Sequence, residues 1–240
     1  MQELILLSLL VFFSSMIGTI TSFGTATIMV PVMANFYSYN PILLFTGIIH
    51  WFGNLWKMYF FKSGMNVKLI LLFGIPGIVA SYIGASLILD IDQVILSRIL
   101  GVFLIIYVVF VTLNNKWKLP KNNLTAIAGG LSSGFFSGIF GIGGAVRATF
   151  LSAFKLQKDV FIFTAGAIGF FIDSSRLVNY LSNNISLEGI FLWGLFLFVP
   201  ISLLGAYVGK RVVNKLPQER FRNVVAVGLA LIALKLIFFP

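Results

Sequence analysis

Apolar residues fall into eight long runs that short polar loops separate. The runs span residues 4–36, 42–61, 67–89, 94–113, 124–154, 160–181, 187–209 and 221–239. Their lengths reach the roughly 20 residues that an α-helix needs to cross the hydrocarbon core of a bilayer. No long polar linker or low-complexity tract interrupts the chain, so the pattern predicts one all-α, polytopic integral membrane domain over residues 1–240.

Composition narrows the class further. Hydrophobic residues make up 59% of the chain and charged residues 10%, whereas soluble domains carry about 25% charged residues. Cysteine is absent, which excludes disulfides, thiolate metal sites and cysteine nucleophiles. The formal net charge is +10, but the cations lie in the short loops, which is typical of topology control rather than of a nucleic-acid surface. We therefore expect no nucleic-acid partner, no metal and no cofactor.

The first run of each half, residues 4–36 and 124–154, is long for one membrane span and short for two, which need about 40 residues. Each run contains a break rich in small residues, at 22–26 and 141–145. Lipid cannot satisfy the backbone groups that such a break exposes, so it must be buried in protein or line a wet cavity. We predict that each run folds as a re-entrant helical hairpin, with two arms of about 15 residues at helical pitch.

The two halves carry the same polar pattern. At an offset of 119 residues, positions 22–26 align with 141–145. Three further pairs match at this offset: His50 with Gly169, Asn54 with Asp173, and Lys57 with Arg176. Internal duplication is common among secondary transporters. We predict repeat one over residues 1–113 and repeat two over 122–240, joined by a cytoplasmic loop at 114–121.

Loop charges predict the orientation of the chain. The basic loop residues are Lys57, Lys62, Lys68, Lys116, Lys118, Lys121, Lys155, Lys158, Lys210, Arg211, Lys215, Arg220 and Arg222, and the acidic ones are Glu3, Asp90, Asp92 and Glu188. If both long runs return to their starting side, every basic loop is cytoplasmic, as the positive-inside rule requires. Each half then crosses the membrane an odd number of times, so the repeats are inverted. Both termini are expected outside, in a multi-pass protein of the inner (cytoplasmic) membrane.

The paired breaks also indicate chemistry. Interrupted helices in the two halves of a membrane chain point to a transporter's binding site. Each break precedes a helix N-terminus, whose free N–H groups and positive dipole end attract anions. Arg147 follows Gly144 by three residues, and its planar guanidinium suits an oxyanion. The candidate substrate-binding residues are Arg147, Gly141, Gly143, Gly144, Ser22, Gly24 and Thr25.

Two alternatives stay open for these residues. The glycines fit close helix packing as well as they fit a site, and Arg147 fits an ion pair with Asp173. Simple helix packing is the interpretation for four other small residues, Gly205 and Gly209 in the second half with Ser81 and Ala85 near the equivalent place in the first.

A polar stripe runs along the second apolar run of each half. His50, Asn54 and Lys57 are spaced i, i+4 and i+7 and therefore share one helical face. His50, Asn54, Asp173 and Arg176 are the candidate coupling or gating residues. His50, the only histidine, either couples protons to transport or is a structural buried residue. Asp173 and Arg176 form either a structural ion pair or part of the transport site, and Lys57 is expected to snorkel to the cytoplasmic surface.

The repeated break resembles the sulfite exporter TauE/SafE family, also called the toluene sulfonate uptake permease family. That family's pattern is roughly Gly-x-Gly-Gly-Gly-x-x-x-x-Pro in each half. The second half here has Gly141, Gly143, Gly144 and Ala145, with Phe150 in the proline position, and the first half has Ser22, Gly24, Thr25, Ala26 and Pro31. The resemblance covers nearly the whole chain. It implies transport of a small anion such as sulfite, sulfoacetate or another organosulfonate.

The sequence as a whole favours a carrier that moves a small anion by alternating access, with the lipid bilayer as its second partner and a homodimer left open. An anion channel would use the same positive site. An intramembrane enzyme is disfavoured because His50, the one histidine available as a base, lies in no Gly-x-Ser-x-Gly context. A structural subunit would not need Arg147 or Asp173 within the membrane.

Overall fold

The computed structural model describes residues 1–62, 64–88, 91–113, 119–213, 230, 233–234 and 236–238. Most of the eighth apolar run, 221–239, and most of loop 114–121 lie outside this set. Several charged residues used to predict the orientation lie outside it too, namely Lys116, Lys118, Lys215, Arg220, Arg222 and Asp90.

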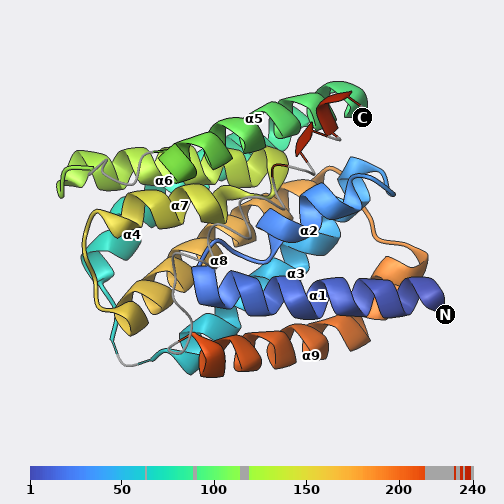
Figure 1. The fold of residues 1–240 in the computed structure, drawn as a ribbon. Coiled ribbons are helices and arrows are strands. Elements are labelled where there is room, and N and C mark those ends of the chain that lie inside the picture. The colour runs from blue at the N-terminus through green and yellow to red at the C-terminus, as the bar shows by residue number, and fades with distance from the viewer. Residues whose placement is uncertain are drawn as a thin grey trace.

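The described residues form nine α-helices and no strand (Figure 1), which confirms the all-α prediction. The helices are α1 (Gln2–Thr21), α2 (Ala26–Met33), α3 (Tyr39–Phe60), α4 (Val67–Leu87), α5 (Gln93–Leu113), α6 (Asn123–Phe140), α7 (Gly143–Ser152), α8 (Lys158–Ser182) and α9 (Gly189–Val212). Within this set α1, α4, α8 and α9 are long and apolar enough to cross a membrane. Local sequence explains two starts: the side chains of Asn66 and Asn122 accept N–H bonds from the first turns of α4 and α6.

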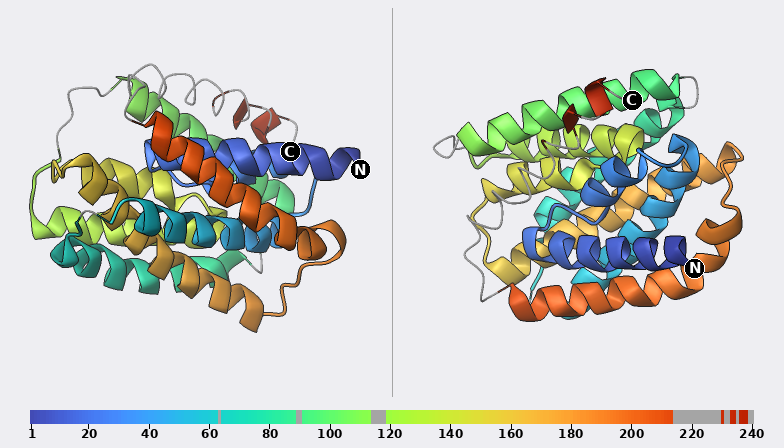
Figure 2. Two further views of the ribbon diagram at one scale, coloured as in Figure 1. Left: turned by 90° about the horizontal axis from the view of Figure 1, so that it is seen from below. Right: turned by 45° about the vertical axis from the view of Figure 1, so that its right-hand side comes forward.

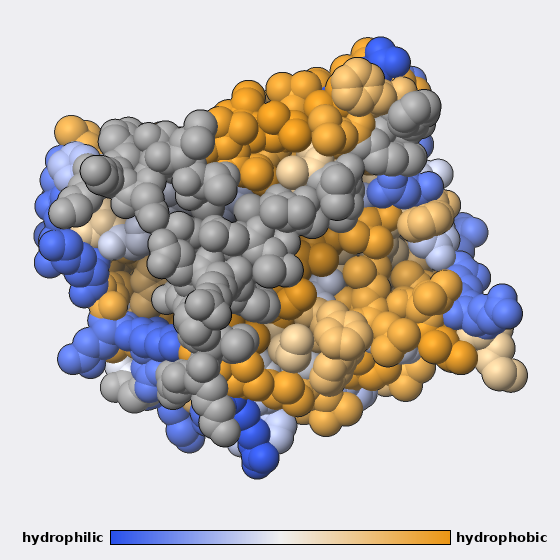
Figure 3. All heavy atoms as spheres, viewed as in Figure 1, coloured by the Kyte–Doolittle hydropathy of each residue, from blue (hydrophilic) through white to orange (hydrophobic). Residues whose placement is uncertain are grey.

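The molecular surface has the polarity of a membrane protein. On the face shown in Figure 3, the described residues in the middle are mostly apolar, and polar residues gather at the two ends. Trp193 and Phe196 on α9 are 72% and 81% exposed. Large side chains of this kind would be costly in water over so wide an area, and they are the normal lipid-facing surface of a spanning helix. The prediction of a polytopic membrane protein is thereby supported by the fold.

Both long runs fold back at their breaks. α6 and α7 lie antiparallel, because a Cβ on Gly129 would contact Phe150 and one on Gly143 would lie 2.0 Å from a backbone carbonyl of α6. The arms have 20 and 8 residues in the first hairpin and 18 and 10 in the second, so the prediction of two arms of about 15 residues is wrong. The breaks come late because Ser22 and Gly141 end the long arms in the left-handed conformation, with φ of 59° and 72°.

One end of the molecule, the acidic face, holds the N-terminus and the α2–α3, α4–α5 and α8–α9 connections (Figures 1 and 2). The Tyr37 hydroxyl donates a 2.7 Å hydrogen bond to Glu3, so α2 returns to the side on which α1 begins. Asn179, near the end of α8, donates a 2.7 Å bond to Ser86, near the end of α4. The acidic residues described at this face are Glu3, Asp92 and Glu188.

The opposite end, the basic face, holds the α3–α4 and α7–α8 connections, the start of α6 and the end of α9. The backbone N–H of Asn66 donates to Thr164, and the Lys158 ammonium donates to the carbonyl of Val213. The charged residues described here are Lys62, Lys68, Lys121, Lys155, Lys158, Lys210 and Arg211, with Asp159 as an acid among them. The fold therefore separates loop charges as the hairpin interpretation requires.

Glycines bring the helices of the two halves into backbone contact. A Cβ on Gly205 of α9 would lie 2.4 Å from the carbonyl oxygen of Phe12 in α1, and one on Gly138 of α6 would lie 2.3 Å from that of Ser81 in α4. The packing interpretation of Gly205 and Ser81 is thus confirmed. α1 pairs with α9 and α6 with α4, while α3 and α8 pack together in the middle. The two halves therefore pair in the same way: the α1–α9 pairing corresponds to the α6–α4 pairing, and the α3–α8 pairing corresponds to itself.

The α4–α6 contact predicts a contrast between two helical glycines. A Cβ on Gly134 would lie 2.2 Å from the carbonyl oxygen of Gly77, whereas one on Gly74 would meet nothing within 4 Å. We expect Gly134→Ala to lower stability by about 1–3 kcal/mol through overpacking. Gly74→Ala should be neutral or stabilising by up to about 1 kcal/mol. Thermal unfolding of the purified variants measures both, and equal effects would contradict the contact.

The loop arrangement predicts accessibility from the two sides of the membrane. The natural chain has no cysteine, so single cysteines give an unambiguous signal. We expect cysteines at Asp92 and Glu188 to react with an impermeant thiol reagent added outside intact cells. A cysteine at Lys155 should react only after the membrane is permeabilised. The predicted cytoplasmic loop 114–121 implies the same for Lys118, which lies outside the described residues. Labelling of Asp92 and Glu188 from opposite sides would contradict the hairpin topology.

Candidate functional site

The two breaks meet inside the molecule. A Cβ on Gly144, at the start of α7, would lie 1.9 Å from the carbonyl oxygen of Phe23 in the first break. From this meeting point α2 runs to the acidic face and α7 to the basic face (Figure 1). The first turns of both short helices, with their free N–H groups and positive dipole ends, therefore lie together. This is the paired arrangement that the repeated sequence pattern predicts.

Glycine is required at both contacting positions. Gly144 has no room for a side chain because a backbone carbonyl occupies the place of its Cβ. Gly24 has φ of +88°, and its Cβ would lie 2.3 Å from Nε2 of His50. The two interpretations of the glycines, close packing and a binding site, are therefore compatible. The glycines allow one break to pack closely on the other and on His50.

The carboxylate of Asp173 is the centre of a buried hydrogen-bond network. Asn54 Nδ2 donates to Oδ2 at 2.8 Å, and His50 Nδ1 lies 3.0 Å from the same oxygen. Arg176 Nε donates to Oδ1 at 2.8 Å, and Ser137 Oγ donates to it at 3.3 Å. All five side chains are at most 1% exposed. The predicted Asp173–Arg176 ion pair is present, and α3, α6 and α8 each contribute to the network.

Arg147 lies at the start of the second turn of α7 and is 1% exposed. Its Nε and Nη2 have no hydrogen-bond partner among the described residues. The ion pairs described for Asp173 go to other side chains, so the alternative in which Arg147 pairs with that carboxylate does not match this geometry. A Cβ on Gly169 would come within 2.6 Å of Arg147 Nη2 and 2.7 Å of Asn54 Nδ2. The missing side chain at Gly169 makes room for the guanidinium.

Lys57 also points into the molecule. It is 1% exposed, and its Nζ donates to Oδ1 of Asn54 at 3.4 Å. The prediction that Lys57 snorkels to the surface is wrong, because α3 is an interior helix whose polar face packs on α8. A Cβ on Gly166 of α8 would lie only 3.1 Å from the Cβ of Lys57, so a glycine again makes room for a cation.

The remaining predicted binding residues lie in the two breaks or directly next to them. Gly141 lies beside the network, since its Cβ would be 3.0 Å from Nη1 of Arg176. Ser22 and Thr25 are buried within the first break. Gly143 packs inside its own hairpin against α6, where its Cβ would lie 2.7 Å from the Cβ of the network residue Ser137.

Two buried polar residues near the network escaped the sequence analysis. Ser137 is one helical turn before Gly141, and Tyr180, whose hydroxyl donates to the carbonyl of Gly138, is one turn beyond Arg176. Their spacing from residues already singled out was the available signal. Serine and tyrosine are too common in membrane helices for that spacing alone to identify them.

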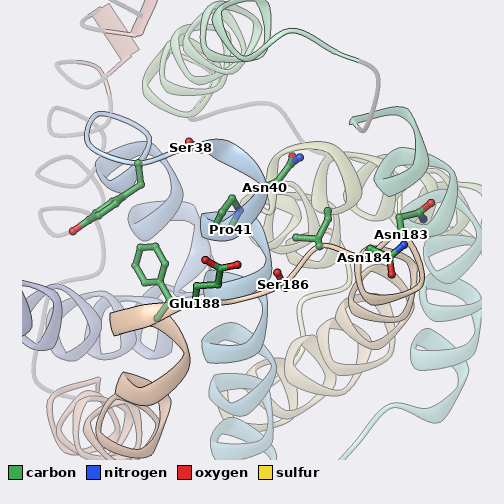
Figure 4. Close-up of a pocket in the computed structure, with 10 residues that line it drawn as sticks. Ser38, Asn40, Pro41, Asn183, Asn184, Ser186 and Glu188 are labelled. Carbon is green, nitrogen blue, oxygen red and sulfur yellow. The ribbon is translucent and has the colours of Figure 1, made fainter.

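A polar pocket opens at the acidic face, between the α2–α3 and α8–α9 loops (Figure 4). Its volume is about 710 Å³, and its lining residues include Ser38, Asn40, Pro41, Asn183, Asn184 and Glu188. Burial, together with the nearby Glu3 carboxylate, raises the pKa of Tyr37 at its edge to about 12, so the hydroxyl stays protonated. From Pro41 to His50, α3 rises about 14 Å, and every residue between them except Ile48 is buried, so this pocket is separate from the network.

Comparison with known proteins agrees with the geometry. The family model for sulfite exporter TauE/SafE matches residues 7–236. A search of curated proteins and a search of solved structures each found no match. The family match covers α1 to α9 apart from the first few residues, including both breaks and Arg147. The chain is therefore a multi-pass membrane protein that belongs to the sulfite exporter TauE/SafE family of membrane transporters of sulfite-type anions.

Proposed function

We propose that this protein is a secondary transporter that binds a small oxyanion, such as sulfite or an organosulfonate, where its two helix breaks meet. The observation that carries the proposal is the buried guanidinium of Arg147, which has two N–H-bearing nitrogens without described partners. Burying an arginine without a compensating anion is costly, and within a membrane such a residue is a functional candidate by default. An oxyanion at this point would accept the free donors in paired hydrogen bonds.

The short helices add to the attraction. The N-termini of α2 and α7 meet at Gly144, three residues before Arg147, and each brings free N–H groups and a partial positive charge. Helix termini would be a weak argument alone, since they also occur at purely structural breaks. Together with a charged side chain on one of the two helices, they support a site that favours anions over neutral solutes.

Transport by alternating access requires that the site open to each side in turn. The network and Arg147 are at most 1% exposed, so an anion could reach them only after helices move. We infer that the two halves are inverted repeats that rock against each other. The paired contacts of α1 with α9 and α6 with α4 support this, as does the hydrogen bond between the matched residues Asn54 and Asp173. An anion channel is the alternative, and it would conduct through a continuous path.

His50 is the proposed coupling residue. It lies between the Asp173 carboxylate on one side and Gly24 of the first break on the other. A proton on its imidazole would therefore change the charge of the network and the group that contacts the break. Asn54, Asp173 and Arg176 would then hold this histidine and the site in register.

The role of Arg147 predicts a graded loss of anion binding. Arg147→Lys keeps the charge but loses the planar fork, so we expect weaker binding of sulfite. Arg147→Ala should weaken it further, by about 2–5 kcal/mol if the anion is fully desolvated. Arg98→Ala, at an exposed position on α5, is the matched control and should bind normally. Calorimetric titration of the folded variants with sulfite measures these affinities. Wild-type affinity in Arg147→Ala would contradict the proposal.

The role of His50 predicts a change in pH dependence. In proteoliposomes we expect His50→Gln to flatten the dependence of anion uptake on a pH gradient while anion exchange persists. The amide keeps a hydrogen-bond donor for Asp173 but cannot carry a proton. A saturable flux with counter-transport would support a carrier, and a large unitary current a channel. If the variant keeps the wild-type pH profile, His50 is structural.

A further inference from the structure

The buried charges at the centre do not balance. The fully buried Lys, Arg, Asp and Glu side chains among the described residues are Lys57, Arg147, Arg176 and Asp173. In their ordinary protonation states these residues are three cations and a single carboxylate, which leaves an excess of two positive charges before His50 is counted. Uncompensated charge is expensive in a low-dielectric interior, so an occupant that brings the missing negative charge would be strongly favoured.

The carboxylate cannot serve all three cations. Asp173 already accepts bonds from Asn54, Arg176 and Ser137 and has His50 beside it. Its charge is matched most directly by Arg176, at 2.8 Å. The two cations left over are Arg147 and Lys57, neither of which forms an ion pair in the described part of the chain.

These two remaining cations lie on either side of one amide. Lys57 Nζ contacts Oδ1 of Asn54, while the guanidinium of Arg147 and Nδ2 of Asn54 crowd the same position at Gly169. Asn54 is thus the neutral group between two positive ones. It is also the repeat counterpart of Asp173, so the second half has a carboxylate where the first half has an amide.

We infer that the site selects a doubly charged oxyanion, held by Arg147 and Lys57 together, over a singly charged one of the same shape. This inference rests on the proposed function and adds the charge of the substrate to it. A dianion neutralises both excess charges, whereas a monoanion leaves one cation buried without a counter-charge. Lys57 is therefore the residue that sets the charge preference, and Arg147 is needed for either anion.

Sulfate and methanesulfonate provide the test. Both are small and tetrahedral at sulfur, and they differ by one negatively charged oxygen in place of a methyl group. We expect calorimetric titration of the wild-type protein at constant ionic strength to give at least about tenfold tighter binding for sulfate. Lys57→Gln should remove most of that preference by weakening sulfate binding while changing methanesulfonate binding little.

Lys62→Gln is the matched control, because Lys62 is an exposed lysine just beyond the end of α3. It should keep the wild-type preference. Equal or tighter binding of methanesulfonate by the wild-type protein would overturn the inference and leave the anion site in place. A failure of both ions to bind would overturn the proposed site as well. The comparison of sulfate and methanesulfonate binding by the wild-type protein tests the inference even if Lys57→Gln does not fold.

Discussion

The carboxylate of Asp173 is the point on which the centre of the molecule depends. It is fully buried, and its charge is stabilised by donors from three helices, with Asn54 on α3, Ser137 on α6 and Arg176 on α8 itself. In a low-dielectric interior such bonds are strong, but a missing partner is costly, typically about 3–5 kcal/mol for a broken buried ion pair. The network therefore fixes how the interior helices α3 and α8 lie against each other and against the hairpin of α6 and α7.

The breaks can reach this centre only because backbone replaces side chain there. Gly144 touches the carbonyl of Phe23, and Gly24 touches His50, at distances that no Cβ would permit. Gly169 does the same for Arg147. The glycines thus have two different effects. Gly24 lies in a helix break, which leaves N–H groups free, and Gly169, inside α8, leaves room for the guanidinium of Arg147. A chain with alanine at these positions could keep its apolar pattern and still lose the site.

The sequence predicted the features that follow from hydropathy and from repetition. The apolar runs predicted the helices. Runs 4–36 and 124–154 are too long for one span and too short for two, which predicted the hairpins. The 119-residue offset paired Asn54 with Asp173, and the structure joins these two residues by a hydrogen bond. The unequal hairpin arms were missed because their lengths depend on where Ser22 and Gly141 turn left-handed, not on hydropathy.

The orientation of Lys57 was missed for a related reason. Sequence shows that Lys57 shares a helical face with His50 and Asn54, but not whether α3 is an interior helix, which is a property of the packing. The same packing buries Lys57 and Arg147, and the free-energy cost of burying these charges needs an explanation. Replacing buried charged groups with well-packed apolar residues is often neutral or stabilising, so stability alone does not account for Arg147 and Lys57. Their burial fits the proposed state, in which an anion shares the site and its charge stabilises the closed structure.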